Sequence, residues 1–341
     1  MIRLTTACVL AVLASASPAA PVAGLNEAQV PVAGRSEADR AAATRAALAA
    51  VLVKMTGDRQ APARAPGLLR DANRFAQRFQ YLTVPAPEGN GTALELRVGF
   101  DARGLGAALA GAGLSAWTRE RPRVAVWISG APIGPQALVG ADDATGIAEA
   151  VRQRASARAV PVVLPRADEE DSARLGTNAG APDFVAASGR YGANAVAAAV
   201  LAAQPGGTWE AQWTLWLDDG SSQWSSQGAT PAAAVEAGVD LVADALARAL
   251  ALPAEAFAAQ PLELVVRGVR NVADYARVQK YLASIDGVTA VSVRAAEADR
   301  LRIGVTVRGG AQALARAVTY GSVLSAAADG QGIFDLIGGG G

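Results

Sequence analysis

Apolar residues recur along this chain at two spacings, and the spacing changes many times between residues 28 and 328. A spacing of two predicts a strand, and a spacing of three or four predicts a helix. The clearest strand candidate runs from Leu301 to Val307, where apolar residues alternate with Arg, Gly and Thr, so one face should be buried and the other solvated. The repeated alternation predicts an α/β protein of the α+β kind, built from three small mixed α/β domains.

The first domain is predicted at residues 28–115. Ser36, with Asp39 three residues later, forms a weaker version of the capping box and predicts the start of a long helix that Gly57 ends. Strands are predicted at residues 29–34, 80–84 and 94–100, and further helices at residues 68–79 and 105–114.

The middle domain is predicted at residues 122–252, after a linker at residues 116–121. Its first strand, Val124–Ile128, is continuously apolar, which is typical of a strand buried on both faces. Asp219 and Gly220 are predicted to form a hairpin turn that places Trp224 opposite Leu215. The other elements are helices at residues 147–154, 183–191 and 232–250 and strands at residues 160–164 and 195–201. This order resembles the anticodon-binding-like domains of periplasmic proteins, an analogy of fold alone.

The last domain is predicted at residues 262–328, after a linker at residues 253–261. Asn271 caps a helix that ends at Ser284, and Gly287 turns the chain into the next strand. A β-α-β-β-α order of this length indicates a ferredoxin-like fold.

Composition and charge narrow the function classes. The chain has 341 residues, of which 51% are hydrophobic and 18% are charged, so it can bury a core. The 31 basic and 31 acidic residues cancel, which predicts neither a nucleic-acid partner nor an anionic-membrane surface. A membrane span needs about 20 apolar residues in a row, and none is predicted.

The first residues predict export. Met1–Arg3 is a short positive start, Leu4–Leu13 is an apolar run, and small residues before Ala16 or Ala19 form a cleavage signal. Residues 1–19 are therefore interpreted as a signal peptide, and the protein as periplasmic or secreted. A lipoprotein is the disfavoured alternative, because Cys8 follows too short an apolar run.

The residue types exclude most catalytic chemistry. The chain has no histidine, and its only cysteine is Cys8, so serine or cysteine triads and zinc or haem sites lack their usual groups. No phosphate-binding glycine loop occurs, and no cofactor or metal is predicted. Paired acids remain: Asp168–Asp171 is interpreted as a solvated loop or helix start, and Asp218–Asp219 as a turn.

Two residues are candidates for partner binding. Lys54 precedes Gly57 in a polar helix end, although the negative end of a helix by itself favours a cation there. Trp216 is the one aromatic residue on the polar face of its strand. Either the helix at residues 232–250 or another domain covers it, or it anchors a partner.

Several short motifs occur together in one order along the first half of the chain. They are Val30-Pro31-Val32, Val51 to Gly57, Phe79-Gln80-Tyr81, Val98 to Asp101, Trp117, and Arg121 to Trp127. In this order the chain resembles the bacterial domain-of-unknown-function family 2066. The resemblance implies a secreted envelope protein without an assigned activity, and it supplies no catalytic residues.

The sequence therefore favours a periplasmic, non-enzymatic accessory or scaffold protein that acts through contact with an envelope protein. The alternative is a hydrolase of cell-wall glycan that uses only Asp and Glu, one as acid and one as base.

Overall fold

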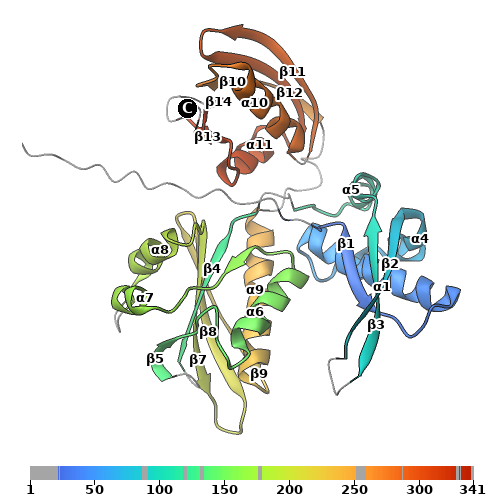
Figure 1. Cartoon of the computed structure of the whole chain (residues 1–341), viewed down its shortest axis with the longest axis vertical. Helices are drawn as coiled ribbons and strands as arrows, with labels where there is room; N and C mark the ends of the chain where they lie inside the picture. The colour runs from blue at the N-terminus through green and yellow to red at the C-terminus, as the bar shows by residue number, and fades with distance from the viewer. Residues whose placement is uncertain are drawn as a thin grey trace, which may run out of the picture.

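The computed structural model describes residues 22, 24–86, 91–117, 121–130, 134–175, 179–250, 259–285, 287–327, 330 and 332–338. The predicted signal peptide and most of the predicted linker at residues 253–261 lie outside the described residues. Residues 259–261 are not linker, because they begin a strand of the last sheet. The described chain forms three sheets, each packed with helices (Figure 1). The predicted mixed α/β class with several small domains is confirmed. We call them the N-terminal unit (24–117), the middle unit (121–250) and the C-terminal unit (259–338).

The N-terminal unit is an antiparallel sheet of order β1-β3-β2 with helices packed on it. Ser36 accepts a hydrogen bond from the Asp39 amide at 3.1 Å, and Gly57 ends the helix in the left-handed conformation, so both predicted caps are confirmed. The elements are β1 (Glu27–Pro31), α1 (Glu37–Thr56), α2 (Ala61–Arg64), α3 (Pro66–Arg70), α4 (Ala72–Phe75), β2 (Ala76–Pro85), β3 (Thr92–Phe100) and α5 (Ala102–Gly111).

The predicted helix at residues 68–79 is wrong. Two short helices, α3 and α4, occupy its first part, and β2 begins already at Ala76. Phe79 pairs with Val98 of β3 in this strand. Hydrogen bonds to β3 outweigh the local helical pattern, since strand formation depends on the neighbouring strand.

The middle unit has a mixed sheet of order β5-β4-β7-β8-β9, with β6 also paired to β4. Helices α6 and α9 cover one face, and α7 and α8 cover the other (Figure 1). The elements are β4 (Val124–Gly130), β5 (Gly134–Leu138), α6 (Ile147–Ala157), β6 (Val162–Val163), α7 (Glu169–Arg174), α8 (Ala181–Gly189), β7 (Ala195–Ala203), β8 (Trp209–Leu217), β9 (Gly220–Gly228) and α9 (Pro231–Leu250). Val126 and Trp127 of β4 are buried in cores on opposite faces, which confirms that β4 is buried on both.

The predicted hairpin register is shifted by two residues. Asp218 and Asp219 form the turn, so that Leu217 pairs with Gly220 and Trp224 lies opposite Trp213 instead of Leu215. Asp218 adopts a φ of 49°, a left-handed conformation that Asp tolerates better than most residues. A shift of two preserves the side-chain alternation, so Trp224 stays on its predicted face.

The C-terminal unit has a sheet of order β11-β12-β10-β14-β13. Because β10 and β11 each pair antiparallel with the strand β12 between them, they run parallel in the predicted split β-α-β arrangement. The hairpin β13–β14 was not predicted, and β14 joins the sheet parallel to β10. The elements are β10 (Ala259–Arg267), α10 (Val272–Ser284), β11 (Val288–Glu297), β12 (Arg300–Arg308), α11 (Gly310–Thr319), β13 (Leu324–Ala326) and β14 (Ile333–Leu336).

The end of α11 contacts the middle unit. Tyr320 is buried in the main core of that unit, and Arg316 donates to the Leu250 carbonyl at 2.8 Å. Burial raises the pKa of Tyr320 to about 12. No helix among the described residues has the length and apolar character that crossing a membrane requires.

Candidate functional site

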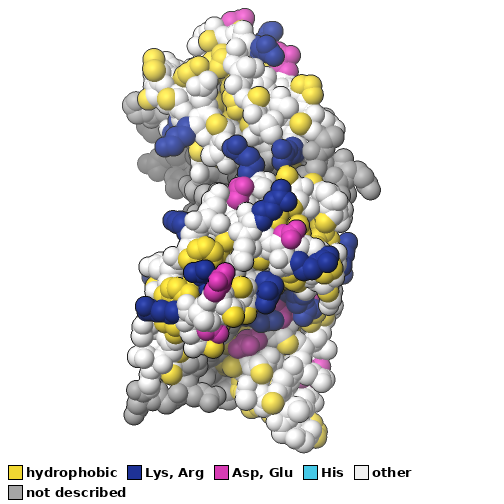
Figure 2. Space-filling view, turned by 90° about the vertical axis from the view of Figure 1, so that its right-hand side faces the viewer, with side chains coloured by type: hydrophobic (Ala, Val, Ile, Leu, Met, Phe, Trp, Pro, Cys, Tyr) yellow, Lys and Arg dark blue, Asp and Glu magenta, His cyan; other side chains and the backbone are white. Residues whose placement is uncertain are grey.

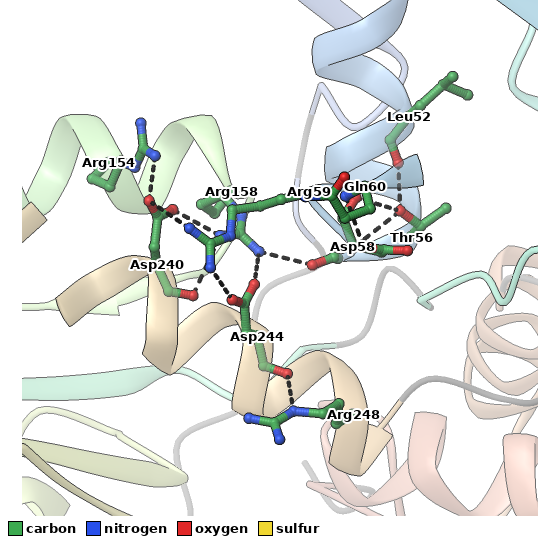
Figure 3. Close-up of polar contacts among 11 residues, drawn as sticks. Leu52, Thr56, Asp58, Arg59, Gln60, Arg154, Arg158, Asp240, Asp244 and Arg248 are labelled. Carbon is green, nitrogen blue, oxygen red and sulfur yellow. Dashed lines mark hydrogen bonds and ion pairs between the residues drawn. The ribbon is translucent and has the colours of Figure 1, made fainter. Parts of the chain in front are cut away.

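Charged side chains gather where the N-terminal unit meets the middle unit (Figure 3). The segment after α1 brings Arg59, and helix α9 brings Asp240 and Asp244. Helix α6 brings Arg154 and, at its C-cap, Arg158. Residues four apart lie on the same face of a helix, so each helix presents both of its charges to the other. We call these five residues the charged seam.

Arg158 is the centre of the charged seam, and its side chain is only 3% exposed. Its guanidinium lies 2.7 Å from the Asp240 carboxylate and 2.6 Å from the Asp244 carboxylate. It also donates to the carbonyl of Gly57 at 2.7 Å. One buried cation therefore joins α6, α9 and the end of α1.

Asp240 is the most buried acid of the seam and accepts from both Arg154 and Arg158. Burial raises its pKa, but the hydrogen bonds from the two arginines outweigh burial, so the pKa lies below its ordinary value. The Asp240 carboxylate thus stays ionised and neutralises the two arginines. Arg59 extends the network to the surface through Asp244, at 2.7 Å.

A cleft of about 530 Å³ opens beside the seam and is lined by residues of both units. Its two acids are Asp58 and Asp244, and both are ion-paired: Asp58 lies 2.8 Å from Arg64, and Asp244 pairs with Arg59 and Arg158. Among the described residues, no three acids come together as a metal site would require. On the face shown in Figure 2, basic and acidic side chains are interspersed rather than gathered by sign.

Lys54 lies near the charged seam but does not line the cleft. Its ammonium donates to the Glu27 carbonyl at 2.9 Å, and burial lowers its pKa. Its own carbonyl accepts from Arg121 at 2.6 Å, and Arg121 also donates to the Ala159 carbonyl of the middle unit at 2.7 Å. The structure places Lys54 in the contact between the two units.

Trp216 lies on the sheet face that α8 covers. Its ring stacks on Phe184 of α8 with centroids 5.4 Å apart and an interplanar angle of 22°. The expectation that the helix at residues 232–250 or another domain covers it is wrong. Helix α9 packs on the opposite face, against Trp213 and Leu215, and α8 belongs to the same unit as Trp216. Lys54 and Trp216 belong to separate clusters.

The acids at residues 168–171 form the start of α7, one of the two interpretations that the sequence left open. Asp168 is the N-cap, and hydrogen bonds from Arg190 lower its pKa to about 2. The buried Asp171 accepts from Arg190 at 2.8 Å and from the Tyr191 hydroxyl at 2.6 Å. Asp168 and Asp171 are thus ion-paired with Arg190, the C-cap of α8, and join the start of α7 to it.

Sequence reasoning missed the charged seam. Its arginines and aspartates lie far apart in the chain, from 82 residues between Arg158 and Asp240 to 185 between Arg59 and Asp244. The available signal is the matched spacing of four in each helix, Arg154 with Arg158 and Asp240 with Asp244. Spacing alone does not say which helices meet.

Comparison with known proteins corrects the family assignment. A family model described as "Domain of unknown function (DUF8605)" matches residues 19–118, so the resemblance to family 2066 is wrong. The match covers the N-terminal unit alone and confirms a domain of uncharacterised activity.

No curated protein matches the chain. A solved structure, the formyltetrahydrofolate deformylase from Pseudomonas putida KT2440, is 12% identical, and the match covers 57% of this chain and 91% of that one with a TM-score of 0.20. A similarity of this size carries no information on activity.

Proposed function

We propose that the chain is a non-enzymatic accessory or scaffold protein of the bacterial periplasm that acts through contact with another envelope protein. The observation that supports this role is the pairing of the cleft acids Asp58 and Asp244 with arginine. In these pairs each carboxylate faces a guanidinium, whereas a carboxylate-only hydrolase needs two carboxyl groups that face each other across the substrate.

The pKa values favour this role over a carboxylate-only hydrolase. A glycosidase needs one carboxyl with a raised pKa as its general acid. Burial raises the pKa of Asp143 and of Asp240, but hydrogen bonds to each carboxylate outweigh burial, so both pKa values are lowered. Asp168, hydrogen-bonded by Arg190, is lowered to about 2. None of these three aspartates suits the role of acid.

Capture in the native envelope tests the role. The tagged protein is crosslinked in intact cells, and the captured proteins are identified against an unrelated tagged periplasmic protein as the control. We expect one envelope protein to be enriched reproducibly. The purified protein is also incubated with isolated peptidoglycan, and release of soluble glycan fragments, lost on replacing one Asp or Glu, would support the hydrolase instead.

The proposed compartment has a separate test. Amino-terminal sequencing of the stable protein from the periplasmic fraction should begin at Ser17 or Ala20, after cleavage following Ala16 or Ala19. An intact Met1 on the stable protein would exclude export through this signal.

A further inference from the structure

Strand β9 forms one end of the middle sheet, paired with β8 alone in the sheet order of the described residues. Its sequence from Gly220 to Gly228 contains no charge and no proline, and its pairing with β8 is continuous from end to end. Natural edge strands are usually protected against further pairing by charges, prolines or bulges. β9 has none of these devices.

The edge strand of the C-terminal sheet shows the contrast. β11 carries Arg294 and Glu297, and its pairing with β12 shifts register twice. Such irregularities block the addition of another strand. The regular, uncharged edge of β9 therefore differs from the edge at β11.

The two ends of β9 carry opposite charges. The turn that precedes β9 is negative, because it consists of Asp218 and Asp219. After it, Thr230 caps the 20-residue helix α9 by accepting from the Ala233 amide at 3.1 Å. The first turn of a helix is positive, because its amides are unpaired and its peptide dipoles are aligned.

The strand is complementary to itself in the antiparallel direction. With a two-fold axis through Trp224, Gln223 lies opposite Ser225 of a second copy, and Ser222 lies opposite Ser226. Each acidic turn then lies opposite the start of α9 in the other copy. All strand pairs are neutral, and both ends join opposite charges.

We propose that β9 pairs antiparallel with β9 of a second copy of this chain, around a two-fold axis at Trp224, so that two middle sheets become one. A strand of an unrelated protein would satisfy the edge amides and carbonyls, and a second copy in addition brings an opposite charge to each end of the strand. Figure 1 shows β9 beside α9, the only helix with extensive contacts to it among the described residues. The inference does not depend on the proposed function.

Sedimentation analysis over a range of concentrations tests the proposal. The unmodified chain is compared with variants that carry like charges on the outer edge of β9. Gln223 and Ser225 are both exposed, so substitutions there leave the core intact. The unmodified chain should sediment as a dimer. In the double variant Gln223→Lys/Ser225→Lys, lysines lie opposite lysines in both pairs, and dimer dissociation should increase by about tenfold or more. Gln223→Glu/Ser225→Glu should weaken the dimer to a similar extent. Mixing the two double variants should restore a dimer, because each lysine then lies opposite a glutamate.

Gln80→Lys is the matched control, because Gln80 is an exposed residue of β2, the edge strand of a different sheet. It should leave the dimer unchanged. Circular dichroism of each variant separates dissociation from unfolding, and the mixed sample would not recover if the variants were misfolded. A chain that stays monomeric at its highest soluble concentration, a dimer that both double variants keep, or a mixture that does not reassociate would each overturn the proposal.

Discussion

At the scale of single residues, buried charge is the most consequential feature of this protein. Moving an arginine out of water costs several kcal/mol unless well-placed acceptors compensate it. Arg158 has such acceptors in two carboxylates and one carbonyl, all within 2.7 Å. Removing one partner leaves the other charge buried and unpaired, which destabilises the fold more than replacing the whole pair with apolar residues.

We expect Asp240→Leu to lower the free energy of unfolding by about 3 kcal/mol or more, because Arg154 and Arg158 lose their shared buried acceptor. Urea denaturation followed by circular dichroism measures the change. Glu149→Gln is the control, since Glu149 forms an exposed pair with Arg152 that contributes about 1 kcal/mol at most. Equal effects of the two substitutions would contradict the account of the seam.

Trp216→Ala should lower the free energy of unfolding by about 2 kcal/mol, less than for a fully buried tryptophan, because the half-buried ring loses its stack on Phe184. Trp216→Phe keeps an aromatic ring and should lose much less. The melting temperatures of the two variants and the unmodified protein measure this loss. An unchanged melting temperature combined with loss of a captured partner would instead identify Trp216 as a partner anchor.

At the scale of elements, α9 lies unusually close to the middle sheet. A Cβ on Gly238 would stand 2.0 Å from Nε1 of Trp213. That nitrogen donates to Ser226 at 3.0 Å, and Ser226 donates to the Ala234 carbonyl at 2.7 Å. A glycine, a serine and a tryptophan thus hold the helix against β8 and β9.

We expect Gly238→Ala to destabilise the protein by about 2 kcal/mol, although alanine favours helix by about 1 kcal/mol, because the ring of Trp213 cannot move without breaking this contact. Gly106→Ala in α5 is the matched control: its Cβ would meet no atom within 4 Å, and it should stabilise by up to about 1 kcal/mol. Urea denaturation compares both, and a stabilised Gly238→Ala would refute the close approach.

The contact between α6 and α9 should also depend on pH. The pKa of Asp240 lies below 3.8 in the folded protein, so its ionised form stabilises the fold above that value. This stability should be lost as the pH falls below about 3.8 toward the folded-state pKa. Melting temperatures from pH 7 to pH 2 should show Asp240→Asn well below the unmodified protein at neutral pH, with the gap narrowing in acid. A constant gap would contradict the assignment.

At the scale of the whole molecule, the first two units are joined more tightly than the predicted linker at residues 116–121 implies. Trp117 is buried, and Arg121 lies over its ring at 4.0 Å with no exposed surface. The charged seam adds a second connection between the same units. The N-terminal and middle units should therefore resist separation.

Limited digestion with a broad-specificity protease tests this arrangement. The expected early products are a C-terminal fragment, from cleavage in the predicted linker at residues 253–261, and one fragment that contains both preceding units. Mass spectrometry of the products identifies the cut sites. Early cleavage at residues 116–121 would show that the first two units are separate.

Local signals in the sequence predicted most of the helices and strands correctly. The caps at Ser36 and Asn271 are hydrogen bonds between a side chain and its own helix, at 3.1 Å and 2.8 Å. The alternation from Leu301 to Val307 matches β12, whose apolar residues are buried. These features depend on neighbours within a few residues, so the sequence by itself determines them.

The tertiary structure decided which elements meet. It replaced the end of the predicted helix at residues 68–79 with the start of β2, moved the hairpin turn to Asp218 and Asp219, and added β14 beside β10. It also brought Arg158 to Asp240, which no local pattern links. Strand pairing and buried ion pairs gain their energy from groups distant in the chain, and that energy exists only after the sheets have packed.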